Sequence, residues 1–273
     1  MQRRERTTPQ MFVFCYHKVG TVLFTNVASK LAARFGLTMT STLGLVRSID
    51  RGADIVIFAH SLLDVDLGDY DYRGIHLVRD PRDVWVSGYL YHRRCTEQWC
   101  VNADLDPSPP IDFPRVPFSQ RHRPETWKRA YLEGLAGRSY QQNLRDLDQS
   151  AGMRFELERY TAWTLEAMAA WTPRPDRILE MRLEAFARDF DGGMTTALSW
   201  LGVAEAALPQ ALAIAATEDV ARMDDRQVAG NPHIHSRKLS KWSAVLSAGD
   251  LREFEARHGE LIARLGYMPG AQI

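Results

Sequence analysis

An arginine and a serine that can hold an anion stand where a predicted strand gives way to a predicted helix. The mostly apolar run 75–78 ends at Arg79, and helical spacing of apolar and small residues then covers 81–94. A guanidinium can grip a phosphate through two parallel hydrogen bonds, and the amides at a helix start add partial positive charge. Ser87 follows eight positions after Arg79, about two helical turns on, so its hydroxyl can reach the same anion. This segment is therefore predicted to bind a phosphate group.

A second predicted anion site lies near the N-terminus. The apolar run 11–16 indicates a buried strand, and an amphipathic helix is predicted over 20–35. The loop between them carries Lys18 and Gly20, which is the arrangement of a phosphate cradle. It is not a Walker A loop, because its lysine precedes the glycine and no Gly-Lys-Ser or Gly-Lys-Thr occurs in the chain. The sequence thus gives little support to a magnesium-assisted ATP site.

Both predicted anion-binding loops connect the end of a strand to the start of a helix, so the fold must contain several such connections. The alternation of strands and helices predicts an α/β fold of three layers, with a central, mostly parallel sheet flanked by helices. Strands are predicted at 11–16, 38–40, 54–59, 74–78 and 177–182. Helices are predicted at 20–35, 81–94, 125–148, 154–171, 184–190, 193–202, 205–215, 217–223 and 249–264, with a short helix or turn at 43–48. Loops are predicted at 95–124, which is rich in proline, and at 225–242.

Composition excludes several classes of function. The chain has 273 residues, 45% of them hydrophobic, and a net charge of zero, which predicts one globular domain over 1–273 and no field that would attract nucleic acid. No apolar run approaches the roughly 18 residues that a membrane span needs. Three cysteines indicate a reducing, cytoplasmic setting and no disulfide scaffold. His92, Cys95 and Cys100 are too few and too irregularly spaced to predict a metal site.

The two anion loops together resemble a known family. Residues 17–21 resemble the 5′-phosphosulfate loop of PAPS-dependent sulfotransferases, and residues 77–89 resemble the segment that binds the 3′-phosphate in that family. Further similar segments follow in the family's order over nearly the whole chain. They are residues 54–60, 178–186, 198–202, 236–242 and 265–267.

The resemblance implies a sulfotransferase fold of the P-loop NTPase-like type and a role for each matching residue. Lys18 would contact the phosphosulfate, and His60 would be the general base that deprotonates the acceptor. Arg79 and Ser87 would bind the 3′-phosphate, with Arg237 or Lys238 from the tail. The remaining predicted nucleotide contacts come from the first loop, and they are His17, Val19, Gly20, Thr21 and Val22.

The same resemblance implies the substrates and the wider organisation. PAPS would be the donor and PAP the product, with no metal required. The acceptor would be a hydroxyl on a small molecule, a lipid or a carbohydrate, in a pocket shaped by the insertion 95–150, and residues 225–245 would close over the nucleotide. Homo-oligomerisation stays open.

The chain departs from the family pattern at four positions, where Val22, Leu23, Phe58 and Leu239 replace residues that are common there. Two alternatives therefore stay open. One is a P-loop kinase, which predicts Mg²⁺ dependence and affinity for ATP. The other is a PAP-binding protein without turnover.

Overall fold

The computed structural model describes residues 8–231, 233–234, 236–268 and 270. They form two compact units, each made from two stretches of chain. The first contains the residues up to Arg79 together with Ala170–Val228, and the second contains Asp80–Ala169 together with the residues from Ala229 onward. The single domain expected over 1–273 stays a prediction. The predicted closing segment 225–245 includes two residues, 232 and 235, that lie outside the described part.

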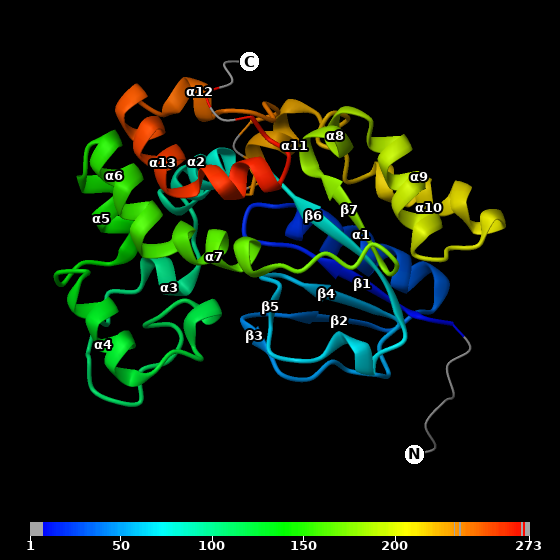
Figure 1. The fold of residues 1–273 in the computed structure, drawn as a ribbon, viewed down its shortest axis with the longest axis horizontal. Coiled ribbons are helices and arrows are strands. Elements are labelled where there is room, and N and C mark those ends of the chain that lie inside the picture. The colour runs from blue at the N-terminus through cyan, green and yellow to red at the C-terminus, as the bar shows by residue number, and fades with distance from the viewer. Residues whose placement is uncertain (1–7, 232, 235, 269, 271–273) are drawn as a thin grey trace. The chain divides into compact units, whose positions relative to one another are not determined.

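A five-stranded parallel sheet is the centre of the first unit (Figure 1). Its order is β2-β4-β1-β6-β7, so that β1 lies between β4 and β6. The strands are β1 (Gln10–Phe14), β2 (Met39–Thr42), β4 (Ile55–Phe58), β6 (Tyr72–Val78) and β7 (Ile178–Arg182). All four residues of β4 are buried, as expected for a parallel strand covered on both faces. The prediction of an α/β fold with a parallel central sheet flanked by helices is confirmed.

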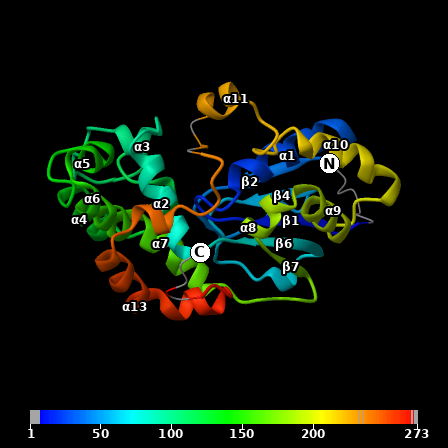
Figure 2. The ribbon, with the colours of Figure 1, turned by 90° about the horizontal axis from the view of Figure 1, so that it is seen from above.

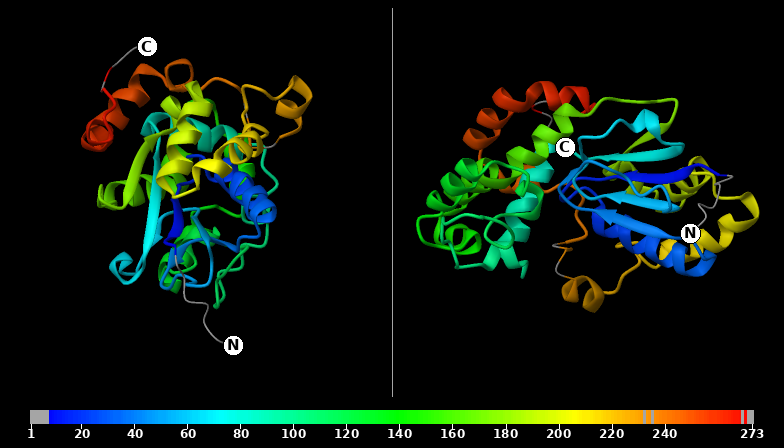
Figure 3. Two further views of the ribbon diagram at one scale, coloured as in Figure 1. Left: turned by 90° about the vertical axis from the view of Figure 1, so that its right-hand side faces the viewer. Right: turned by 90° about the horizontal axis from the view of Figure 1, so that it is seen from below.

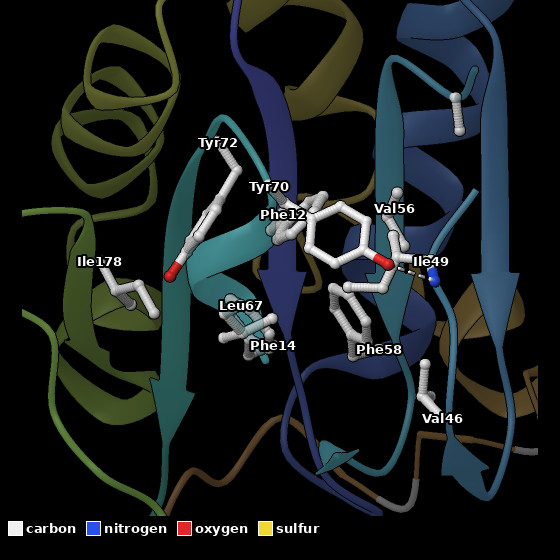
Figure 4. Close-up of a cluster of buried hydrophobic side chains, with 11 residues drawn as sticks. Phe12, Phe14, Val46, Ile49, Val56, Phe58, Leu67, Tyr70, Tyr72 and Ile178 are labelled. Atoms are coloured by element: carbon white, nitrogen blue, oxygen red, sulfur yellow. Dashed lines mark hydrogen bonds between the residues drawn. The ribbon is translucent and has the colours of Figure 1, made fainter. Parts of the chain in front are cut away.

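Aromatic side chains cover one face of this sheet (Figure 4). Phe12 stacks on Tyr72 with ring centroids 4.6 Å apart, and Phe14 stacks on Phe58 at the same distance. Tyr70 packs on the cluster, and its hydroxyl accepts a hydrogen bond from the Ile49 amide at 3.2 Å. Alternate residues of neighbouring strands point to the same face, which brings these rings together.

Helices pack against the other face. They are α1 (Thr21–Phe35), α8 (Leu183–Arg188) and α9 (Phe190–Trp200), and α10 (Leu208–Ala216) packs on α1 and α9. Helices α1 and α10 lie side by side (Figures 2 and 3). Glu218, just beyond α10, links them by accepting hydrogen bonds from Asn26 at 2.9 Å and from Lys30 at 2.5 Å.

Three short segments of the first unit differ from the predictions. The helix or turn expected at 43–48 is instead β3 (Leu45–Val46), which pairs with β5 (Leu62–Leu63) in a small parallel sheet. The helix expected at 217–223 is a series of turns. The short helix η1 (Leu67–Asp69) was not expected, whereas the helix expected at 205–215 is formed by η4 (Glu205–Ala207) and α10.

The second unit is helical. Helix α2 (Pro81–His92) packs on the C-terminal helix α13 (Ala248–Arg264) (Figure 1). Between them Trp85 stacks on Phe254 with ring centroids 4.9 Å apart. The other elements are α3 (Gln98–Val101), η2 (Phe118–Gln120), α4 (Glu125–Glu133), α5 (Tyr140–Asp146), α6 (Gln149–Glu156), a π-helical segment (Leu157–Thr161), α7 (Ala162–Ala170) and α12 (Trp242–Val245). Helix α11 (Asp225–Gly230) lies inside the predicted loop 225–242.

The helix predicted over 125–148 is broken in two. Ala136 and Gly137 adopt positive φ values of 52° and 74°, and Ser139 then begins α5 with a capping box to Gln142. The helix predicted over 154–171 is longer at its start, because α6, the π segment and α7 run on without a gap. Helix α3 lies in a stretch that we predicted to be loop.

All three cysteines are buried as free thiols. Cys15 belongs to the first unit, and Cys95 and Cys100 to the second. Within the described part of the chain, no helix has the length and apolarity needed to cross a membrane.

Candidate functional site

Three adjacent parallel strands of the first unit end at the same edge of the sheet. Phe14, the last residue of β1, pairs with Phe58 of β4 on one side and with His76 of β6 on the other. The segments that follow these strands contain Lys18, His60 and Arg79 respectively. The carboxyl edge of a parallel sheet is where ligands bind in α/β folds.

The backbone of the loop after β1 turns sharply to begin α1. Lys18 adopts φ 62° and Gly20 adopts φ 77°, both in the left-handed region. The Val19 amide donates to the Tyr16 carbonyl at 2.9 Å, which closes the turn. A Cβ on Gly20 would lie 3.1 Å from the Leu77 Cδ1, so the position needs glycine for its conformation and for its close packing.

Gly20 is also the N-cap of α1, and no side-chain hydrogen bond caps this helix in the part of the chain that the structure describes. The first amides of a helix lack partners within the helix, so they are suited to an anion. The Thr21 hydroxyl donates to the Tyr16 carbonyl at 2.9 Å and lies 3.4 Å from the Ala59 carbonyl. The hydroxyl proton of Thr21 is therefore used in these contacts with Tyr16 and Ala59. The backbone amide and the hydroxyl oxygen of Thr21 are the groups that can bind a ligand.

Arg79 reaches this loop directly. Its side chain is buried, and Nη1 donates to the Lys18 carbonyl at 2.9 Å. Arg79 and the loop of Lys18, which we predicted to bind one nucleotide, thus meet in the first unit. The contact itself was not predicted, and it gives Arg79 a second role, which is to support the loop that carries Lys18.

His60 lies half-buried two residues beyond β4. Its Nδ1 accepts a hydrogen bond from the Gly44 amide at 3.1 Å. Ser61, which follows it at φ 46°, donates from its hydroxyl to the Cys15 carbonyl at 2.7 Å. The histidine is therefore held between the ends of β1 and β2.

The charged residues that follow Arg79 in the sequence, Asp80 and Arg82, lie at the start of the second unit. The Asp80 carboxylate caps α2 by accepting from the Arg82 amide at 2.9 Å, and it pairs with the Arg82 side chain at 2.7 Å. Arg82 is buried, pairs with Glu255 at 2.8 Å and lies over the Trp242 ring at 4.1 Å. These contacts give Asp80 and Arg82 structural roles.

Asp83 holds the tail of the chain beside the first turn of α2. Its carboxylate accepts from the Lys241 amide at 2.7 Å and from the Trp242 amide at 3.1 Å. Ser87 lies about one turn further along α2 and is half-buried. Arg237 and Lys238 are exposed a few residues before the anchored Lys241, so the second unit brings the predicted tail cations to the region of α2.

Two groups at the site were missed from the sequence. The Gly44 amide has no side-chain signature, and only its position after a short strand could have suggested a turn. A chain of hydrogen bonds also leads from the buried Tyr16 and His76 to the exposed Glu180, with the Tyr16 hydroxyl 2.9 Å from His76 Nε2 and His76 Nδ1 2.9 Å from Glu180. Tyr16 begins the loop, so this chain supports the loop from beneath.

His76 is stacked on Trp171, with ring centroids 3.9 Å apart. Burial lowers the pKa of His76, and this effect exceeds the opposing one of the Glu180 carboxylate. In the neutral ring Nδ1–H donates to Glu180 and Nε2 accepts from Tyr16. Among the described residues there is no cluster of three or more His, Cys, Asp or Glu side chains arranged to hold a metal ion.

Comparison with known proteins gives matches among solved structures. No family model matches the chain, and no curated protein does. One similar structure is mouse sulfotransferase SULT7A1 complexed with PAP, with 14% identity, a TM-score of 0.46, and coverage of 94% of this chain and 84% of the other. Another is retinol dehydratase in complex with androsterone and inactive cofactor PAP, with 12% identity, a TM-score of 0.42, and coverage of 97% and 82%. We therefore base the function proposed for this chain on its own residues.

Proposed function

We propose that this chain is a PAPS-dependent sulfotransferase that moves a sulfuryl group to an acceptor hydroxyl on a small molecule, a lipid or a carbohydrate. The observation that carries the proposal is the contact of Arg79 with the loop of Lys18 at the carboxyl edge of the sheet. There the Arg79 side chain meets the backbone of the loop that carries Lys18, next to a helix start that no side chain caps in the described structure. That arrangement suits a nucleotide with more than one phosphate group.

The first loop would stabilise the leaving group. Charge develops on the oxygen that bridges sulfur and phosphorus as their bond breaks. Lys18 and the amides of Gly20, Thr21 and Val22 can bind this oxygen and the phosphate attached to it. His17 and Val19 would line the same loop.

Recognition of the 3′-phosphate would distinguish PAPS from ATP. We assign this to Arg79 and Ser87, with Arg237 or Lys238 from the tail that Asp83 anchors. His60 would contact the acceptor oxygen. The insertion 95–150 would form the acceptor pocket, and residues 225–245 would close over the nucleotide.

We propose that no metal is needed, because the transferred sulfuryl group carries less charge than a phosphoryl group. The kinase alternative lacks a hydroxyl residue after Lys18, where a P-loop holds Mg²⁺. The cytoplasmic location stays a prediction from sequence, and homo-oligomerisation stays open.

The test is thermal unfolding with PAP, AMP and ADP, each without added magnesium. We expect PAP to raise the melting temperature clearly more than AMP or ADP, because only PAP carries the 3′-phosphate; a ligand at about 100 times its Kd adds about 2.7 kcal/mol of stability. Arg79→Ala should remove most of this advantage. Equal shifts for PAP and AMP would exclude a 3′-phosphate site, and a shift by ATP that needs magnesium would favour a kinase. Turnover of labelled PAPS with phenols, alcohols, amines and oligosaccharides then separates an enzyme from a binding protein.

A further inference from the structure

The position of the proton on His60 follows from its contact with Gly44. Gly44 and His60 each come two residues after paired strand positions, since Thr42 of β2 pairs with Phe58 of β4. Gly44 adopts φ 69°, and its N–H donates a hydrogen bond to Nδ1 of His60 at 3.1 Å. An N–H donor requires a lone pair on the nitrogen that it meets.

A neutral imidazole carries one N–H, so the proton of His60 must be on Nε2. Protonation of Nδ1 would set two N–H groups against each other, and the Gly44 contact thus also disfavours the imidazolium form. A general base, in contrast, needs its lone pair on the nitrogen that faces the substrate.

His76 in the same unit shows the opposite arrangement. Its Nδ1 meets the Glu180 carboxylate at 2.9 Å, which is an acceptor, and its Nε2 meets the Tyr16 hydroxyl at 2.9 Å. A carboxylate partner fixes the proton on Nδ1 and leaves the lone pair on Nε2. The chain therefore holds His60, beyond the end of β4, and His76, within β6, in different tautomers.

We infer that His60 acts in sulfuryl transfer as a hydrogen-bond donor through Nε2–H, set in that state by the Gly44 amide, and not as the general base. This inference rests on the proposed function. It replaces the role that the family resemblance implied for His60.

The step balances without a protein base. The acceptor hydroxyl loses its proton to water or buffer, and the Nε2–H of His60 stabilises the oxyanion. This oxygen attacks sulfur, a new sulfur–oxygen bond forms, and the bond from sulfur to the bridging phosphate oxygen breaks. Its electron pair leaves on PAP, beside Lys18. The apparent pKa of the pH–rate profile should then follow the acidity of the acceptor and not that of an imidazole.

The proton can be located without any assay of activity. In ¹⁵N-histidine-labelled protein, long-range ¹H–¹⁵N correlations distinguish the two neutral tautomers, and the signals are assigned with His60→Asn and His76→Gln. We expect Nε2–H for His60 and Nδ1–H for His76, with and without PAP. An Nδ1–H tautomer at His60 would overturn the inference.

A matched pair of variants tests the role itself. In His60→Gln the side-chain amide nitrogen can reach the position of Nε2–H and replace it as a donor. In His60→Asn the shorter amide can replace only the acceptor that meets Gly44, and neither amide can take up a proton. We expect His60→Gln to retain activity within about tenfold of the parent and His60→Asn to lose about 10²- to 10³-fold. An equal loss in both, at unchanged PAP affinity, would restore the general base. If the parent protein transfers sulfate to no acceptor, the proposed function fails, while the NMR result still decides the tautomer.

Discussion

The loop Tyr16–Gly20 and the turn Asp80–Asp83 are both short charged segments next to a helix start, yet they are held in opposite ways. Backbone contacts and positive φ values shape the loop. In the turn, side chains do this: the carboxylates of Asp80 and Asp83 and the guanidinium of Arg82 all bind neighbouring parts of the second unit. A charge in the loop should therefore matter for chemistry, and a charge in the turn for stability.

The largest expected effects come from removing one cation of each kind, Arg82 from the turn and Lys18 from the loop. Arg82→Ala leaves the buried Asp80 carboxylate without its ion-pair partner, and loss of one member of a buried pair costs about 3–5 kcal/mol in the free energy of unfolding. Lys18→Ala should change that free energy by about 0.5 kcal/mol or less and lower the transfer rate about 10²- to 10³-fold. Urea unfolding and single-turnover assays measure the two quantities. A strongly destabilised Lys18→Ala, or a fully stable Arg82→Ala, would remove the contrast.

A pair of glycine variants sharpens the role of the loop backbone. Gly20 and Gly36 both have positive φ, at 77° and 66°, but only a Cβ on Gly20 would meet neighbours, with Leu77 at 3.1 Å. Left-handed conformation alone costs a residue with a side chain about 1–2 kcal/mol. We expect Gly36→Ala to show this cost and Gly20→Ala to exceed it and to weaken PAP binding as well. Equal stabilities in urea would mean that the contact with Leu77 adjusts freely.

The smallest expected effect concerns the hydrogen-bonded chain beneath the loop. Burial lowers the pKa of His76 in the folded protein below the ordinary value of 6.5. The unfolded chain then binds a proton first as the pH falls, so the contribution of His76 to stability is complete above pH 6.5 and is lost progressively below it.

We therefore expect the free energy of unfolding to fall less in His76→Gln than in the parent protein between about pH 7.5 and about pH 5.5. Tyr16 and Glu180 face this histidine and stay unchanged in the variant. Burial also lowers the pKa of His258 in the second unit, and that contribution is common to both proteins. Identical pH dependence of urea midpoints in parent and variant would show that His76 does not carry the effect.

The strands that position the site, β1, β4 and β6, were predictable because each is a short, mostly apolar run that is followed within three residues by a histidine or an arginine. Residues 54–59 and 74–78 illustrate this, since β4 and β6 occupy nearly the same positions. Two-residue strands such as β3 have no periodicity to detect, and the break after α4 depends on positive φ at Ala136, which composition does not reveal.

The residue types of the site were predictable, but their partners were not. Lys18 and Arg79 stood out by motif, whereas the Gly44 amide is a backbone group, and its contact with His60 requires β2 and β4 to be neighbours. The chain from Tyr16 through His76 to Glu180 likewise depends on the strand order, which places sequence-distant residues on adjacent strands.

The burial of the cysteines makes each unit its own reporter of opening. Sulfur-specific reagents find Cys15 only when the first unit opens, and while the unit is closed burial also raises the pKa of that thiol and so keeps it in the unreactive protonated form. Cys95 and Cys100 report on the second unit, and the hydrogen bond from Cys100 lowers the pKa of Cys95 below its ordinary value. Pulse alkylation during gradual denaturation, followed by peptide mass spectrometry, would thus reveal which half of this chain loosens first, without any engineered label.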